Sequence, residues 1–110
     1  MQTNKDVAAR KDDAISGGVG MMTQVYVDRA ENSEIWDIEG NRYIDFSSGI
    51  AVVNTGHRHP KVIEAVKKQL DSFTHTCHQV VPYENYVALA ERLNDMVPCT
   101  SEDKKTVFVT

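Results

Sequence analysis

Residues 47–60 read SSGIAVVNTGHRHP, an apolar run followed by a Gly-His-Arg-His-Pro turn. Short alternating segments precede this stretch and amphipathic patterns follow it, so it joins two kinds of structure. Pro60 suits the first turn of a helix, where its missing N–H is no loss. Because glycine lets a backbone approach a ligand closely, such a junction in an α/β protein often carries a functional site.

The sequence before this junction predicts a small antiparallel meander. We expect strands at residues 24–28, 34–38 and 42–46, with a turn at 29–32 and a glycine-containing hairpin turn at 39–41. Trp36 and Ile38 share one face of the second strand, so Trp36 is expected to pack the meander rather than to bind a ligand.

The first twenty residues predict an appendage to this meander. Residues 4–15 read as a weak helix or an arm, which the sequence SGGVG at 16–20 interrupts. No apolar strand precedes these glycines and no Lys-Ser or Lys-Thr pair follows them, so a hinge is favoured over a phosphate-binding loop.

The sequence after the junction predicts two helices and a strand. The first helix runs from Pro60 to about residue 71, and the second from Pro82 to Pro98, with a loop at 72–81 between them. Their predicted buried stripes are Val62, Ile63, Val66 and Leu70, and Tyr86, Leu89, Ala90, Leu93 and Val97.

Residues 106–110, TVFVT, are typical of a strand buried on both faces of a parallel sheet. Because such a strand needs neighbours, we expect the chain to be the N-terminal part of a longer protein. The alternative is a complete small domain whose last strand pairs with the meander.

The composition excludes several classes of protein. The chain has 110 residues, of which 41% are apolar and 25% charged, and its formal charge is −4. Without a basic cluster it offers nucleic acid no electrostatic attraction, and no apolar run reaches the roughly 20 residues of a membrane helix. Cys77 and Cys99 form no disulfide framework. We therefore expect a cytoplasmic protein with reduced thiols, no nucleic-acid partner and no membrane segment.

Two sets of side chains invite chemical interpretations. Four zinc ligands could come from His57, His59, His75, Cys77 and His78, but their spacing matches no familiar zinc pattern. We expect no metal site, and instead expect His57 and His59 to cap the helix at Pro60 and to hydrogen-bond within its turn. A Cys77–His78 nucleophile pair would require adjacent loop side chains to meet, which is the less favoured interpretation.

Several stretches resemble the N-terminal region of the class III pyridoxal-phosphate-dependent aminotransferases. They are WDIEGNRYIDF at 36–46 and GIAVVNTGHRHP at 49–60, and the likeness extends from about Gly18 to Thr110. The stretches DRAEN at 28–32 and HTCHQV at 75–80 are most similar to the branch of the family that acts on 4-aminobutyrate.

The resemblance implies the α/β architecture called fold type I. Residues 1–22 would be an N-terminal arm and residues 23–56 the small-domain meander and crossover. Residues 57–110 would begin the large domain that binds pyridoxal 5'-phosphate, with two helices and its first strand. The resemblance also implies a homodimer with active sites at the subunit interface.

The implied activity transfers the amino group of 4-aminobutyrate to 2-oxoglutarate, giving succinate semialdehyde and glutamate. The alternatives are a class III enzyme for ornithine, acetylornithine, 5-aminovalerate or a diamine, and a non-catalytic binding or dimerisation module.

The resemblance assigns substrate contacts to Ile50 and Gln79. An apolar wall suits the methylene chain of an ω-amino acid, and an amide can hydrogen-bond polar groups without adding charge. The family's cofactor-binding lysine and other catalytic and cofactor-binding residues lie downstream, while Lys61, Lys67 and Lys68 fall on a helix surface by their spacing. We therefore expect no catalytic or cofactor-binding residue in this chain, and no activity from the 110 residues alone.

Overall fold

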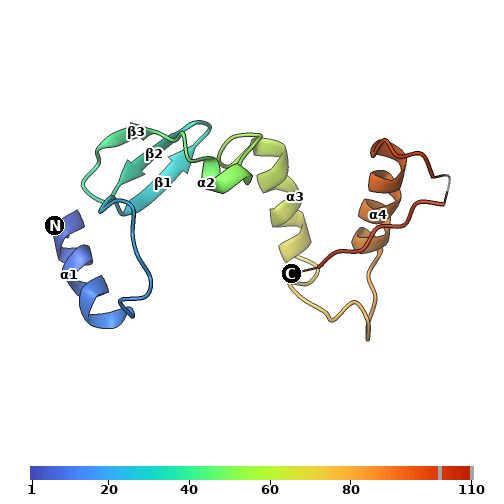
Figure 1. Cartoon of the computed structure of the whole chain (residues 1–110), viewed down its shortest axis with the longest axis horizontal. Coiled ribbons are helices and arrows are strands. Elements are labelled where there is room, and N and C mark those ends of the chain that lie inside the picture. Colours follow the sequence, from blue (N-terminus) through green and yellow to red (C-terminus); the bar gives the residue numbers. More distant parts are fainter. Residues whose placement is uncertain (102, 110) are drawn as a thin grey trace. The chain divides into compact units, whose positions relative to one another are not determined.

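The computed structural model describes residues 1–101 and 103–109 and divides into two units, Met1–Lys67 and Lys68–Thr110. The first unit is built on the three-stranded antiparallel sheet β1-β2-β3, seen in Figure 1. Its strands are β1 (Val27–Glu31), β2 (Glu34–Asp37) and β3 (Arg42–Ile44). The predicted meander and its α/β setting are confirmed.

The predicted bounds of the first strand were wrong. Strand β1 begins at Val27 and continues through the residues predicted as a turn, so the turn itself is Asn32-Ser33. Asn32 has a φ of 50°, a left-handed conformation that asparagine tolerates better than most residues. The extended strand also places the Arg29 guanidinium 3.6 Å from the centroid of the Trp36 ring, a cross-strand cation–π contact.

Asp37 lies at the centre of the first unit. It is 2% exposed and is the only fully buried residue in the described part of the chain. Its carboxylate accepts hydrogen bonds from the side chains of Asn4, at 2.8 Å, and Tyr43, at 2.9 Å, and from the Asn41 N–H at 2.8 Å. Burial alone would raise the pKa of Asp37, but the hydrogen bonds from Asn41, Asn4 and Tyr43 outweigh it and hold the pKa far below its usual range.

The predicted weak helix near the N-terminus forms as α1 (Asn4–Ala14), with a Thr3–Asp6 capping box at its start. Besides its bond to Asp37, the Asn4 side chain accepts a 2.9 Å hydrogen bond from the Tyr26 N–H. The start of α1 is therefore fixed to the sheet by polar contacts at Asn4.

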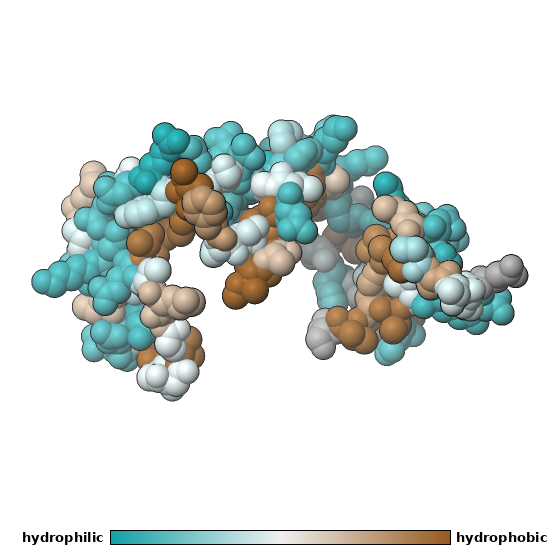
Figure 2. Space-filling view, turned by 45° about the horizontal axis from the view of Figure 1, so that its top comes forward, coloured by the Kyte–Doolittle hydropathy of each residue, from teal (hydrophilic) through white to brown (hydrophobic). Residues whose placement is uncertain are grey.

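The predicted helix at Pro60 is confirmed as α3 (Pro60–Leu70), but its predicted apolar stripe is not buried. Val62, Val66 and Leu70 are 50%, 49% and 59% exposed, because no other element in the described residues covers them. No apolar side chain in the described part of the chain is fully buried, and Figure 2 shows brown apolar surface at several places. The described chain therefore has amphipathic elements without a closed apolar core.

In the second unit, α4 (Glu84–Met96) begins two residues later than predicted, after Tyr83. Two aromatic rings from outside the helix, His78 and Phe108, pack against Tyr86 of α4. The Tyr86 ring stacks on His78, with centroids 3.9 Å apart, and meets the Phe108 ring edge-on at 4.7 Å. These contacts hold the loop before α4 and the segment after it against one face of the helix.

The predicted strand at 106–110 was wrong for residues 106–109, which form no strand. Instead, the Phe108 N–H donates to the Tyr86 hydroxyl at 3.3 Å, and the Thr106 hydroxyl donates to the Asn94 side chain at 2.8 Å. Val107 and Val109 point to solvent, 75% and 84% exposed. A strand forms only beside another strand, and the described second unit contains none. Thr110 lies outside the described residues.

None of the helices in the described residues combines the length and the apolar character needed to cross a membrane.

Candidate functional site

The junction at residues 47–60 contains a left-handed turn, α2 (Ser48–Ala51). The φ angles of Ser48, Gly49, Ile50 and Ala51 are 49°, 56°, 58° and 65°. The Ile50 N–H donates to the Ser47 carbonyl at 2.8 Å, and the Val52 N–H donates to the Ser48 carbonyl at 3.0 Å. The start of the apolar run, residues 48–51, is therefore a tight left-handed turn, which L-residues disfavour.

This turn carries backbone strain. The left-handed conformation costs an L-residue about 1–2 kcal/mol, and it is most unusual for a β-branched residue such as Ile50. Only Gly49 adopts it without this cost. Ile50 is 90% exposed, so burial of its side chain does not offset the strain. Strain that is retained without a packing reward is often found at functional sites.

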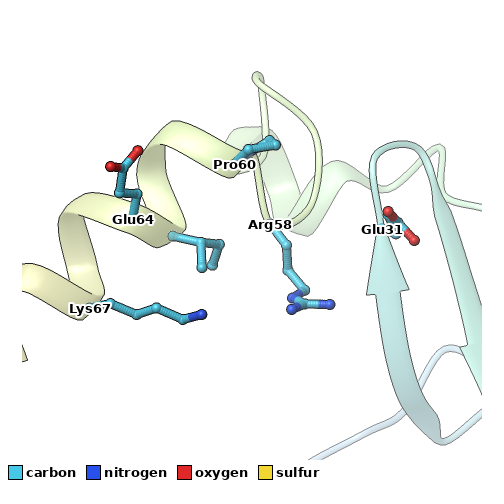
Figure 3. Close-up of a pocket in the computed structure, with 6 residues that line it drawn as sticks. Glu31, Arg58, Pro60, Glu64 and Lys67 are labelled. Carbon is cyan, nitrogen blue, oxygen red and sulfur yellow. The ribbon is translucent and has the colours of Figure 1, made fainter.

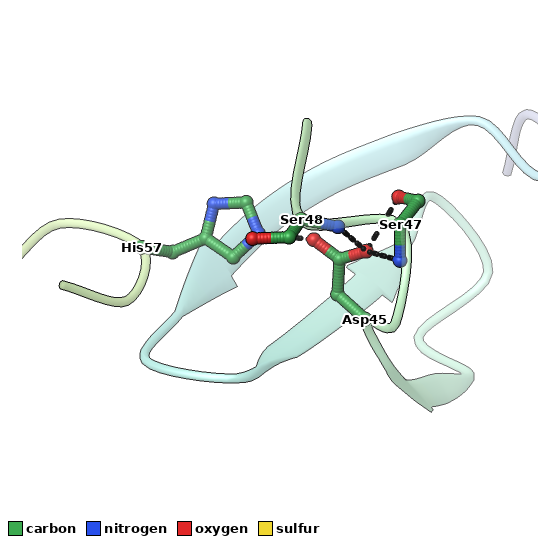
Figure 4. A network of polar contacts seen from close by, with 4 residues as sticks. All are labelled: Asp45, Ser47, Ser48 and His57. Carbon is green, nitrogen blue, oxygen red and sulfur yellow. Dashed lines mark hydrogen bonds and ion pairs between the residues drawn. The ribbon is translucent and has the colours of Figure 1, made fainter. Parts of the chain in front are cut away.

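Asp45 holds the start of the turn. One carboxylate oxygen accepts hydrogen bonds from the Ser47 hydroxyl at 2.6 Å, the Ser47 N–H at 2.9 Å and the Ser48 N–H at 3.0 Å. The other oxygen lies 2.7 Å from Nε2 of His57, as Figure 4 shows. The Ser47 hydroxyl and the His57 ring, with the two N–H groups, outweigh burial and lower the pKa of Asp45 to about 2.

The tip of the β1–β2 hairpin holds the other end of the junction. The His57 N–H donates to the Asn32 carbonyl at 2.7 Å, and the Asn32 N–H donates to the His57 carbonyl at 3.0 Å. Gly56, with a φ of 82°, lies so close that a Cβ atom there would be 2.8 Å from the Asn32 side-chain oxygen. The backbone of His57 is therefore fixed by the sheet, and Gly56 has no room for a larger residue.

Of the two histidines predicted to cap the helix at Pro60, only His59 takes part in its start, through its backbone carbonyl, and the prediction for His57 was wrong. His57 bonds Asp45, while the His59 carbonyl accepts from the Val62 N–H at 2.9 Å and the Ile63 N–H at 3.0 Å and so begins the helix. The Nδ1 atom of His59 is buried without a hydrogen-bond partner among the described residues. This leaves one imidazole nitrogen of the junction unsatisfied in the described chain.

Two hollows adjoin the junction. A hollow of about 340 Å³ lies beside the Asp45–His57 contact and is lined by Asn32, Ser33, Asp45, Ser48, Val53, Asn54, Thr55, Gly56 and His57. A second hollow, of about 410 Å³, is lined by Glu31, Arg58, Pro60, Ile63, Glu64 and Lys67. Figure 3 shows the Arg58 and Lys67 side chains extending into the second hollow. Because two carboxylates line it with these two cations, its lining gives no net preference for a charged ligand.

Gln79, the other predicted substrate residue, lies in the second unit on an exposed turn. The turn is closed by the N–H groups of Val80 and Val81, which donate to the Cys77 carbonyl at 2.9 and 2.8 Å. Its anchor is His78, whose Nδ1 accepts the Tyr83 N–H at 3.4 Å while its ring stacks on Tyr86. Ile50 and Gln79 are thus both exposed loop residues, and each is described within its own unit.

Every described lysine is at least partly exposed, and Lys61, Lys67 and Lys68 are fully on the surface of α3. Across residues 1–101 and 103–109, no three His, Cys, Asp or Glu side chains converge in a way that could hold a metal ion. Cys77 and Cys99 are exposed free thiols.

Comparison with known proteins identifies the family. The family model for Aminotransferase class-III matches residues 15–110. The chain belongs to the class III aminotransferases. This class III chain is 50% identical, over 110 residues, to the 4-aminobutyrate aminotransferase of Escherichia coli, covering 100% of the chain and 26% of that relative. It is 51% identical over 109 residues to the 5-aminovalerate aminotransferase of Pseudomonas aeruginosa, covering 99% of this chain and 25% of that relative.

Solved structures of aminotransferases confirm the fold. The acetylornithine aminotransferase of Elizabethkingia anophelis matches with a TM-score of 0.79 at 24% identity, over 87% of this chain and 24% of that one. The ornithine aminotransferase of Toxoplasma gondii matches with a TM-score of 0.77 at 25% identity, over 87% of this chain and 22% of that one. The chain thus spans about a quarter of the length of the relatives it matches. The resemblance seen in the sequence is confirmed for both family and fold.

The comparisons do not assign Ile50 or Gln79 a role, and their substrate contacts stay predictions. Sequence patterns alone missed Asp45 and Asn32 as contacts of the junction. The signal for Asp45 was present in the sequence, because an Asp two residues before two serines is a common turn-forming arrangement.

Proposed function

We propose that the whole protein carrying this chain is a pyridoxal-phosphate-dependent transaminase that moves the amino group of 4-aminobutyrate to 2-oxoglutarate, producing succinate semialdehyde and glutamate. The observation that carries this proposal is the identity of 50% over the full chain with a 4-aminobutyrate aminotransferase. The proposed enzyme is a cytoplasmic homodimer. The 110 residues alone are proposed to be inactive, because no residue in them is assigned to the cofactor.

A donor one methylene longer, 5-aminovalerate, is the second candidate, because the identity with a 5-aminovalerate aminotransferase is 51%. An apolar pocket distinguishes ligands that differ by one methylene by only about 1–3 kcal/mol. A chain this similar to both enzymes is therefore consistent with a preference between the two donors rather than absolute selectivity.

In the proposed site, Ile50 covers the methylene chain of the donor and Gln79 hydrogen-bonds a polar group of the substrate. The support for Ile50 is its position on a strained turn with its apolar side chain in the open. The support for Gln79 is a closed turn that presents an uncharged amide to solvent. An amide beside an anionic donor carboxylate can donate a hydrogen bond without placing a second charge in the site.

Pyridoxal phosphate, when bound in the whole protein, supplies an electron sink for the negative charge that develops when the donor loses a proton. A solved structure that matches with a TM-score of 0.71 at 26% identity, the taurine:2-oxoglutarate aminotransferase of Bifidobacterium kashiwanohense, is in complex with this cofactor and with glutamate. The role proposed for residues of this chain is to bind and orient the donor.

The test is a set of steady-state assays on the whole protein with 2-oxoglutarate as acceptor. The donors compared are 4-aminobutyrate, 5-aminovalerate, ornithine, acetylornithine and a diamine. We expect the highest kcat/KM with 4-aminobutyrate, 5-aminovalerate second, and no turnover by the 110-residue chain. A higher kcat/KM with ornithine, acetylornithine or a diamine would assign the protein to another branch of class III.

A further inference from the structure

We propose that Asp45 and His57 are positioning residues that together hold the left-handed turn at residues 48–51 and so fix Ile50 where it meets the substrate. This inference rests on the proposed function for the role of Ile50. The hold on the turn itself rests on the geometry of the first unit alone. The pair is called the Asp45–His57 latch below.

The turn needs an external hold because its own contacts are few. Three of its four residues, Ser48, Ile50 and Ala51, are L-residues in the left-handed region, which costs each of them stability. Ile50 and Val52 are 90% and 76% exposed, and Ala51 is exposed as well, so apolar packing does not retain the turn. The turn's own backbone hydrogen bonds would form equally well in a right-handed turn, so they do not select the hand.

Asp45 supplies the contacts that do select it. Its Oδ1 atom accepts the N–H groups of Ser47, which is right-handed, and of Ser48, the first left-handed residue of the turn. Its Oδ2 atom lies 2.7 Å from the His57 ring, on the far side of the loop. One carboxylate thus joins the entry and the exit of the loop, residues 12 apart in sequence.

His57 connects this contact to the rigid part of the unit. Its backbone is paired with Asn32 through hydrogen bonds of 2.7 and 3.0 Å, so the hairpin tip fixes the position of the ring. The ring in turn fixes the second oxygen of Asp45, whose side chain is only 7% exposed. The sheet therefore determines the turn through one imidazole and one carboxylate, and the turn determines where Ile50 points.

A carboxylate can accept at both of these contacts. Both oxygens of Asp45 accept, one from the N–H and hydroxyl groups at Ser47 and Ser48 and one from the His57 ring. An amide has one accepting oxygen and one NH2 group, which can only donate. Asp45→Asn keeps the size of the side chain but removes its negative charge, and it retains both contacts only if the His57 ring accepts the amide N–H at Nε2. Because the size of the side chain is unchanged, this substitution tests the hydrogen bonding of Asp45 rather than the space that it fills.

The experiment uses the whole protein with Asp45→Asn and His57→Phe, and measures KM and kcat for the amino donor together with a crystal structure of each variant. We expect KM to rise about tenfold or more with a smaller change in kcat, because a misplaced contact residue weakens productive binding. The φ angles at 48–51 are expected to leave the left-handed region. The matched control is Tyr43→Phe, which removes a hydrogen bond to Asp37 in the same sheet and is expected to leave KM and the turn unchanged.

A rescue variant distinguishes positioning from general destabilisation. Ala51→Gly removes part of the cost of the left-handed turn without touching the Ile50 side chain. We expect Asp45→Asn with Ala51→Gly to recover most of the lost donor affinity together with the φ angles at 48–51, whereas recovery of thermal stability without recovery of KM would indicate a merely structural defect.

Three results would decide against the proposal or against the function beneath it. A turn that keeps its φ angles in both latch variants overturns the latch. A turn that moves while KM stays constant overturns the link between the latch and the substrate, even though the latch itself is real. If the whole protein uses no ω-amino donor, the proposed function fails, and the latch is then decided by the crystal structures alone.

Discussion

Two aspartates of the first unit each accept several hydrogen bonds, but they stabilise turns of different kinds. Asp37 and Asp45 both collect hydrogen-bond donors from neighbouring residues, and both have a lowered pKa. Asp37 stabilises a hairpin turn whose left-handed position is occupied by Gly40, with a φ of 84°, so it reinforces a conformation that the sequence already favours. Asp45 stabilises a left-handed turn made largely of L-residues. Hydrogen bonds to a carboxylate can therefore stabilise the fold itself, as at Asp37, or a strained turn that exposes a side chain, as at Asp45.

The largest effect is expected at Asp37. Asp37→Ala leaves the donors at Asn4, Asn41 and Tyr43 without their acceptor in the centre of the unit. We expect amide exchange in β2 and β3 to accelerate more than about tenfold, since unsatisfied buried donors are costly. Hydrogen exchange of the 110-residue chain measures this. Unchanged exchange would show that Asp37 is not the stabilising centre.

The next largest effect is expected at Ile50, where one substitution should raise stability and lower donor affinity. Ile50→Gly removes the strain of a β-branched residue at a φ of 58° and is expected to stabilise the unit by about 1 kcal/mol. In the whole protein the same change is expected to raise KM for 4-aminobutyrate about tenfold, because the apolar wall is lost. Thermal melts and donor kinetics measure the two effects.

The matched control is Ala51→Gly, with a similar gain in stability and little change in KM, since Ala51 offers no comparable apolar wall. If Ile50→Gly lowered both stability and donor affinity, the left-handed turn would not be strained as described.

A pH titration sharpens the comparison further. The folded pKa of Asp45 is about 2, below its ordinary value of 3.8, so its contribution to stability is complete above 3.8 and is lost as the pH falls through about 2. We expect the amide NMR signals of Ser47 and Ser48 to show a transition below about pH 4, as the Asp45 carboxylate takes up a proton. In Asp45→Asn this transition should be absent. A transition centred near 4 in the unaltered chain would contradict the lowered pKa.

The smallest effect is expected in the second unit, where the imidazole of His78, rather than a carboxylate, anchors the loop before α4. His78→Phe keeps the ring stack on Tyr86 but removes the acceptor of the long 3.4 Å bond from Tyr83. We expect a loss of about 0.5–1 kcal/mol, and a larger loss for His78→Ala, which also removes the stack. Chemical denaturation of both variants measures the difference. Equal losses would assign the anchoring to the hydrogen bond alone.

The parts of the fold that follow from local pattern could be predicted from the sequence. Pro60 and the apolar spacing after it predicted α3 almost to the residue, and the glycine turn at 39–41 predicted the β2–β3 hairpin. The first strand was misplaced because Asn32, rather than a glycine, makes the β1–β2 turn. The strand at 106–110 was overpredicted because strand formation depends on a neighbour that local sequence does not reveal.

The candidate site could be predicted only in part. Ile50 and Gln79 came from the family resemblance, because an isoleucine in an apolar run and a glutamine in a polar loop carry no chemical signal of their own. The left-handed turn could not be predicted, since SSGIA contains a single glycine. Its hand depends on contacts between Asp45, His57 and Asn32, which lie far apart in the sequence.

The strained turn has a consequence for laboratory evolution of this chain. Ser48, Ile50 and Ala51 each become easier to accommodate when replaced by glycine, so heat resistance alone would reward such replacements. A selection that never supplies the amino donor would therefore remove the side chain that is proposed to recognise it. A screen that alternates heat challenge with growth on the donor as nitrogen source would keep isoleucine at position 50 and accept glycine at position 51.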